Sequence, residues 1–138
     1  MPARDFYHNE VRNALIKDGW TITHDPFPMK LGSADLFVDL GAEKVIAAEK
    51  GNDKIAVEIK SFLGKSIIAE TQGAIGQFIM YQEVLAEYEI DRILYLAVEE
   101  EVFYNTFSEA MRNLLLNRLN LKIIIFNAEE EKIVKWQN

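Results

Sequence analysis

The sequence predicts an α/β fold in which a mixed central sheet is flanked by helices, with the element order αβ(β)ββαβαβ. Short apolar runs, some alternating with polar residues, are typical of strands, and they are interspersed with longer segments whose apolar residues recur every three or four positions. The chain has 138 residues, of which 49% are hydrophobic, and it shows no repeat or low-complexity linker. We therefore expect one domain over residues 1–138.

Helices are expected on both sides of the first group of strands. Residues 5–17 predict an amphipathic helix that ends before Gly19, with an apolar stripe of Tyr7, Val11, Ala14 and Leu15. Residues 67–88 predict a second, long amphipathic helix, and residues 102–119 a third.

The strands are predicted from short apolar runs. Two of them, residues 45–48 and 55–59, are separated by a turn at residues 50–53 and indicate a hairpin. Residues 92–98 are almost continuously apolar, as expected for a strand covered on both faces. Further strands are expected at residues 33–40, 121–126 and 133–136.

A carboxylate and an ammonium lie two positions apart within one of these strands. Side chains alternate between the two faces of a strand, so Ala56, Glu58 and Lys60 share one face while Ile55, Val57 and Ile59 share the other. Residues 33–40 show the same alternation, with Asp35 on the polar side. We therefore expect Asp35 to face Glu58 from an adjacent strand.

These residues predict a site for a hard divalent cation. Mg²⁺ prefers oxygen ligands and keeps several waters, so Asp35, Glu58 and the backbone carbonyl of Ile59 would suffice to bind Mg²⁺ or Mn²⁺. Lys60 would stay off the metal, where its ammonium can polarise the attacking water or stabilise charge on a phosphate. A bound cation, an activated water and a nearby ammonium are the components needed to hydrolyse a phosphodiester.

The arrangement resembles the PD-(D/E)XK nuclease superfamily, which implies a restriction endonuclease-like core. Asp35 would be the first acid, although the preceding Pro of the motif is missing, and Glu58-Ile59-Lys60 would be the (D/E)XK element. Glu10 lies at the edge of the first helix's apolar stripe, and the resemblance implies that it is a further metal ligand. Gln77 and Tyr81 resemble the Gln-x-x-x-Tyr pattern of RecB-type nucleases, and residues four apart meet on one face of a helix.

Over nearly its whole length the chain also resembles a narrower family, the XisH-like fdxN element excision controlling factors of cyanobacteria. The resemblance implies a role in developmental DNA excision, with a site-specific recombinase and a XisI-like protein as partners. A controlling factor could also keep the fold for binding alone, without cleavage. The segments that carry the resemblance are Tyr7-His8, residues 15–20, 39–44 and 56–62, and Gly76-Gln77.

Composition excludes several other classes of protein. The absence of cysteine excludes disulfides and thiolate metal sites. Neither a signal peptide nor a membrane-spanning run is apparent, so a cytoplasmic location is expected. The net charge of −7 argues against indiscriminate DNA binding. Because residues 78–138 carry −5 of it, the amino-terminal part is the expected DNA face, with Lys30, Lys50, Lys54 and Lys65 around the site.

Each candidate residue also has a structural interpretation. Glu58 and Lys60 could be an exposed edge-strand pair, Asp35 could begin a strand at a turn, and Glu10 could be a solvated helix residue. Gln77 and Tyr81 could serve helix packing. His8 and His24 are expected to be structural, and the acidic runs 99–101 and 129–131 to face solvent. A homodimer is a further expectation, because many nucleases of this size reach both DNA strands as twofold dimers.

Overall fold

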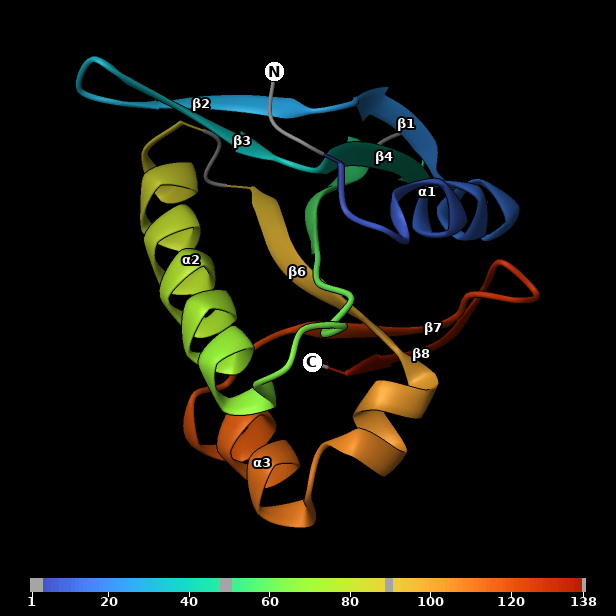
Figure 1. Cartoon of the computed structure of the whole chain (residues 1–138). Helices are drawn as coiled ribbons and strands as arrows, with labels where there is room; N and C mark the ends of the chain where they lie inside the picture. Colours follow the sequence, from blue (N-terminus) through green and yellow to red (C-terminus); the bar gives the residue numbers. More distant parts are fainter. Residues whose placement is uncertain (1–3, 48–50, 89–90, 138) are drawn as a thin grey trace.

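A mixed six-stranded sheet forms the centre of the computed structural model, which describes residues 4–47, 51–88 and 91–137 (Figure 1). Its strand order is β1-β4-β5-β6-β7-β8, and β2 and β3 form a separate two-stranded sheet. The pairs β5·β6 and β6·β7 are parallel and the other three pairs antiparallel, so the sheet is mostly antiparallel. The strands are β1 Thr21–His24, β2 Phe27–Leu31, β3 Ala34–Val38, β4 Leu40–Ala47, β5 Gly51–Ile59, β6 Arg92–Glu99, β7 Ile123–Asn127 and β8 Lys132–Gln137.

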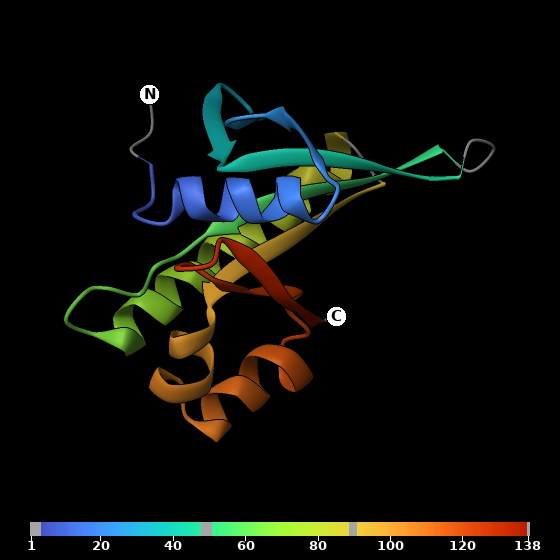
Figure 2. The same ribbon diagram turned by 90° about the vertical axis from the view of Figure 1, so that its right-hand side faces the viewer.

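Two apolar layers cover the two faces of this sheet. Helix α1 (His8–Lys17) packs its buried Val11 and Leu15 against the face that carries Ile55, Val57 and Ile59 of β5. Helix α2 (Ile67–Tyr88) covers the opposite face, where Ala56 of β5 lies. Figure 2 shows α1 in front of the sheet and α2 behind it. The alternation predicted for residues 55–60 is therefore confirmed, and it turns Glu58 toward α2.

The first two predicted helices form. Helix α2 has the predicted bounds, and α1 begins at His8 rather than at residue 5. The Asp5 carboxylate instead accepts a hydrogen bond from the Tyr7 backbone N–H at 2.9 Å, which holds the chain in a turn before the helix. Gly19 closes α1 with a φ of +93°, a conformation that glycine adopts without a Cβ clash.

The third predicted helix is interrupted. Residues Val102–Thr106 and Leu114–Arg118 form π-helical segments on either side of α3 (Glu109–Asn113). Phe107 is extended, with ψ 133°, and Ser108 starts α3 by accepting a hydrogen bond from the Met111 N–H at 3.1 Å. Because this local cap begins a new helix at Ser108, the sequence 102–119 does not form one continuous helix.

The predicted single strand at residues 33–40 is also divided. Residues 34–38 form β3, which pairs with β2 across the turn at Gly32 and Ser33. The chain bends at Asp39 and then enters β4, which pairs with β5. The hairpin expected between residues 45–48 and 55–59 forms with longer strands. Residues 51–53 of the predicted turn belong to β5 instead, and residues 48–50 lie outside the described part of the chain. In the described ranges, no helix is long and apolar enough to cross a membrane.

Candidate acidic site on the sheet

Two carboxylates, Asp39 and Glu58, meet beside the sheet on the face toward α2. Leu40 pairs with Val57, so continuing this antiparallel register by one residue places Asp39 opposite Glu58. The Asp39 N–H donates to Glu58 Oε1 at 3.3 Å, and the Ile59 N–H donates to Asp39 Oδ2 at 2.7 Å. The bend before β4 and the end of β5 thus hold each other through backbone-to-carboxylate hydrogen bonds.

Burial makes this pair electrostatically unusual. Glu58 is 7% exposed, and desolvation together with the charge of Asp39 and a hydrogen bond between the two carboxyls raises the pKa of Glu58 to about 9. Burial also raises the pKa of Asp39, against the opposing effects of its hydrogen bonds from Ile59 and Glu58 and of the nearby His8. The pair therefore retains a proton where isolated carboxyls would be ionised, unless a cation replaces it.

We expect the pH dependence of stability to report this proton. Glu58 ionises near its ordinary pKa of 4.5 in the unfolded chain and near 9 in the folded chain, so the unfolded state loses its proton first as the pH rises. The contribution of Glu58 to the free energy of unfolding is fully present below about pH 4.5 and is lost progressively toward pH 9. The steepest loss is about 1.4 kcal/mol per pH unit.

Urea unfolding of metal-free protein between about pH 5 and 9 measures this effect. Glu58→Gln should make the decline in the free energy of unfolding less steep. The variant should therefore be more stable than wild type by an amount that grows with pH to roughly a few kcal/mol. Glu129→Gln, which removes an exposed carboxylate in the turn between β7 and β8, is the matched control and should keep the wild-type decline. Equal pH profiles for wild type and Glu58→Gln would contradict the buried proton.

Lys60 lies directly after β5, beside the pair. Its positive charge lowers the pKa of Glu58, the smallest of the effects on that group. Its backbone N–H donates to the Ala97 carbonyl of β6 at 3.3 Å, and its side chain is partly exposed. The predicted association of Glu58 with Lys60 is therefore present, with the carboxylate buried and the ammonium reaching toward solvent.

Helix α2 brings Gln77 and Tyr81 to the same region. The Gln77 amide donates to the Tyr81 hydroxyl at 3.4 Å, as their four-residue spacing predicts. Burial, followed by the charge of Glu58, raises the pKa of Tyr81. The amide oxygen of Gln77 is buried without a hydrogen-bond partner among the described residues. Gln77 and Tyr81 are thus packed between α2 and the sheet, on the side of α2 that faces the acidic pair.

Asp35 does not face Glu58, and this prediction was wrong. Asp35 pairs with Lys30 in the β2–β3 hairpin, where their side chains form an ion pair of 2.9 Å. Both side chains are more than 60% exposed, and the hydrogen bond with Asp35 raises the pKa of Lys30. The hairpin turn at Gly32 and Ser33 ties Asp35 to β2, so Asp39, four residues later, takes the place expected of Asp35.

Glu10 is not brought to the pair either. Its charge raises the pKa of Tyr7, after burial and the charge of Glu99, whereas the acidic residue of this region that acts on Asp39 is Asp5. Among the described residues, Glu10 also belongs to no group of three or more His, Cys, Asp or Glu side chains that could hold a metal.

Glu99 was expected to face solvent but is 9% exposed. Its carboxylate accepts hydrogen bonds from the backbone N–H groups of Glu101 and Ala128, which compensate for its burial.

Two residues near the start of α1 were missed as neighbours of the pair. Asp5 accepts hydrogen bonds from the Ser61 hydroxyl and, at 3.2 Å, from the Ser61 backbone N–H. His8 is 3% exposed, and its Nε2 contacts Asp25 Oδ1 at 2.7 Å. The position of His8 three residues before Val11 on the buried side of α1 was the available signal. The structural role expected for His8 agrees with this burial, but its charge also acts on Asp39.

The donor set fits a cation only in part. No group of three or more His, Cys, Asp or Glu side chains is arranged for metal binding within residues 4–47, 51–88 and 91–137. The half-buried Asp39 and the buried Glu58 nonetheless present carboxylate oxygens side by side, a donor chemistry that suits Mg²⁺ or Mn²⁺ when backbone oxygen and water complete the shell. The site thus fits a metal held by two carboxylates, without the predicted Glu10 and Asp35.

The lysines of the expected DNA face are partly engaged. Lys30 binds Asp35, and the Lys54 ammonium lies 3.9 Å from Glu43. Lys65 is exposed after β5, and Lys50 lies outside the described residues. The positive surface available for phosphates is therefore smaller than the count of lysines predicts.

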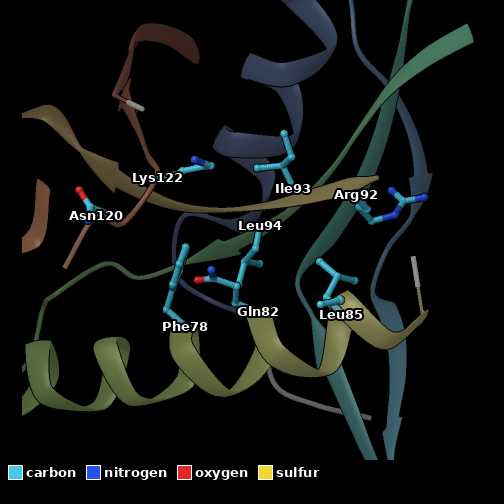
Figure 3. Close-up of a pocket in the computed structure, with 9 residues that line it drawn as sticks. Phe78, Gln82, Leu85, Arg92, Ile93, Leu94, Asn120 and Lys122 are labelled. Carbon is cyan, nitrogen blue, oxygen red and sulfur yellow. The ribbon is translucent and has the colours of Figure 1, made fainter. Parts of the chain in front are cut away.

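A pocket of about 220 Å³ lies further along the same face, between α2 and the starts of β6 and β7 (Figure 3). Leu94, in its wall, pairs with Ala56, two residues before Glu58. At its edge the Arg92 guanidinium donates to the Ile55 carbonyl at 2.9 Å and lies 4.6 Å from the Phe27 ring centre. These contacts give Arg92 a structural role, and the pocket is separate from the acidic pair.

Comparison with known proteins identifies the family. The model of the XisH protein family matches residues 1–134. This chain belongs to the XisH family. A crystal structure of an fdxN element excision controlling factor from Anabaena variabilis superposes with a TM-score of 0.86 at 39% identity, covering 98% of this chain and all of that one. An XisH family protein from Nostoc punctiforme gives a TM-score of 0.86 at 38% identity, covering 97% and 100%. No curated protein matches significantly.

Proposed function

We propose that this XisH family chain is a DNA-acting excision controlling factor that hydrolyses phosphodiester bonds at the Asp39–Glu58 pair. The excision role is taken from the name of the Anabaena variabilis relative, and the hydrolytic role from the site. The observation that supports hydrolysis is a buried, proton-retaining carboxyl pair with a lysine two residues after Glu58. In a restriction endonuclease-like interpretation, Asp39 replaces Asp35 as the first acid.

The chain's own residues have distinct roles in this proposal. Asp39 and Glu58, with the Ile59 carbonyl, would hold Mg²⁺ or Mn²⁺, which when bound supplies Lewis acidity and an activated water. Lys60 orients the attacking water and stabilises negative charge on the phosphate. Gln77 and Tyr81 position the substrate backbone or the pair, a role supported by their mutual hydrogen bond and by the effect of the Glu58 charge on the pKa of Tyr81.

A second candidate function is an accessory factor that binds DNA or protein without cutting. It is favoured by the absence of a third side-chain ligand among the described residues and by the net charge of −7. In this case the partners would be a site-specific recombinase and a XisI-like protein, with the acidic residues 78–138 as the docking half. The buried pair would then be a structural remnant of a nuclease site.

A cleavage assay distinguishes the two functions. Duplex, nicked and branched DNA are incubated with the full chain and Mg²⁺ or Mn²⁺, with and without the XisI-like protein and the recombinase. The hydrolytic proposal expects metal-dependent cleavage that Asp39→Asn abolishes and Asp35→Asn retains, because only Asp39 contacts Glu58. Excision that proceeds equally with Asp39→Asn and wild type would instead establish the accessory function.

A further inference from the structure

The outer face of α2 is unusually apolar for a surface helix. Ile68, Ile79 and Met80 are 58%, 44% and 49% exposed, respectively. The inner face of the same helix is covered by the sheet and buries Ala74, Phe78 and Tyr81. Figure 1 shows α2 at the periphery of the molecule, with the sheet on one side only. The outer face therefore presents apolar side chains that the described chain does not cover.

Six exposed residues of this outer face, Met80 among them, follow the spacing of a helix-pairing seam. Successive members are separated by four, three, four, three and four positions, which is the heptad spacing of two packed helices. All of them are exposed: Ala69, Gly73, Gly76, Met80, Glu83 and Glu87. A helix that follows this seam would contact α2 along most of its length.

Two members of the seam are glycines whose presence the chain's own packing does not require. A Cβ added at Gly73 or at Gly76 would meet no atom within 4 Å. Glycine lowers helix stability relative to alanine, so both positions weaken α2 without an internal benefit. A close approach by another backbone is the physical reason for which glycine suits such a position.

We propose that this face binds the α2 helix of a second copy of the chain, antiparallel, about a twofold axis at Gly76. The order of charges favours this occupant. Lys65, exposed just before α2, and Glu87, exposed near its end, each lie eleven positions from Gly76. The twofold axis therefore brings the start of α2, with Lys65 just before it, to the end of the other copy's α2 near Glu87, where one contact can supply two ion pairs.

The same axis matches shapes. Ile79 and Gly73 each lie three positions from Gly76, so the side chain of Ile79 meets the open surface above Gly73 of the second copy. A parallel pairing would instead bring Glu83 and Glu87 against themselves. Glu83 and Glu87 also make the face unsuited to DNA, since phosphates repel carboxylates.

Dimerisation through α2 would connect the two acidic sites. Gln77 and Tyr81, on the inner side of the helix, contact each other near Glu58. The dimer thus fixes the spacing and orientation of two sites by a single helix pair. This consequence rests on the proposed function, whereas the dimer itself is tested without any cleavage.

Sedimentation velocity of the full chain over a concentration series tests the inference. Wild type should show a monomer–dimer equilibrium, and Gly73→Leu should raise the dimer dissociation constant by roughly 100-fold because its side chain fills the contact. Ile93→Ser, which changes a 42% exposed apolar residue on β6, is the control and should dimerise as wild type. Circular dichroism verifies that each variant is folded.

A charge exchange identifies the antiparallel geometry. Lys65→Glu alone and Glu87→Lys alone should each raise the dissociation constant roughly tenfold, because each creates two like-charge contacts. The double variant should return to within about threefold of wild type, since the pairs are restored with reversed sign. A monomeric wild type, an unaffected Gly73→Leu dimer or a double variant without recovery would each overturn the inference.

Discussion

Asp39→Asn is expected to abolish the rise in melting temperature that Mg²⁺ or Mn²⁺ causes in wild type. A ligand that binds only the folded state at about 100 times its dissociation constant adds about 2.7 kcal/mol of stability. For a domain of this size that corresponds to a rise of roughly 10 °C. Asp39 should be essential because its backbone N–H donates to Glu58 Oε1 and a hydrogen bond joins the two carboxyl groups.

The matched control for this experiment is Asp35→Asn. Asp35 binds Lys30 in the exposed hairpin, so its loss should leave the metal response intact and change stability little. Glu58→Gln should give a third result, raising the stability of metal-free protein at high pH while losing the metal response. A wild type with no thermal response or calorimetric binding at millimolar metal would leave the accessory function as the better description.

Isothermal calorimetry adds a proton count to the same comparison. Because burial and the charge of Asp39 raise the pKa of Glu58 to about 9, metal must displace a proton from the pair at neutral pH. Apparent affinity should therefore increase with pH by up to about tenfold per unit for one released proton. The measured enthalpy should vary with the ionisation enthalpy of the buffer, and it should do so only while Glu58 is present.

Sequence periodicity predicted the elements that bury a single apolar face. The long helix at residues 67–88 and the alternation of residues 55–60 both appear as expected, since each has one apolar face packed on the sheet. The prediction of one helix over residues 102–119 was wrong. The apolar periodicity continues through Phe107 and Ser108, but the extended backbone of Phe107 and the helix cap at Ser108 interrupt the helix there.

The chemistry of the candidate site could be predicted from the sequence, but the identity of its first acidic residue could not. Asp35 and Asp39 stand on the same side of an imagined continuous strand, so alternation cannot distinguish them. The distinction comes from two hairpin registers, one centred on Gly32 and Ser33 and one that places Leu40 opposite Val57. The turn predicted at residues 50–53 would have set Glu58 opposite position 45, so the observed register, which sets Asp39 opposite Glu58, could not be obtained from it.

His8 and Glu99 show a different limit of prediction from the sequence. Each is a polar residue buried by partners distant in sequence, Asp25 for His8 and the backbone of Ala128 for Glu99. Hydrogen-bonding capacity removes the penalty of burying such groups, so composition alone predicts exposure where the fold supplies partners. The residues around the acidic pair could therefore be predicted less completely from the sequence than the pair itself.

Lys60→Met is expected to remove cleavage while leaving metal binding in place. Methionine keeps an unbranched side chain but lacks the ammonium, and Lys60 contributes to the fold mainly through its backbone hydrogen bond to Ala97. Loss of one group that stabilises transition-state charge typically costs about 10²–10³ in rate. Metal affinity should rise slightly, if it changes, because a positive charge near Glu58 is removed.

Single-turnover cleavage, metal calorimetry and DNA binding should be measured on the same preparations. Lys30→Met is the matched control, since Lys30 belongs to the same expected DNA face but lies on the exposed β2–β3 hairpin, where it pairs with Asp35. Each variant should weaken DNA binding by a similar modest factor, because each loses one charge able to contact phosphate. Only Lys60→Met should lose the chemical step. If both variants cleave and support excision as wild type does, Lys60 has no catalytic part, and the buried Asp39–Glu58 pair must serve the fold or a partner instead.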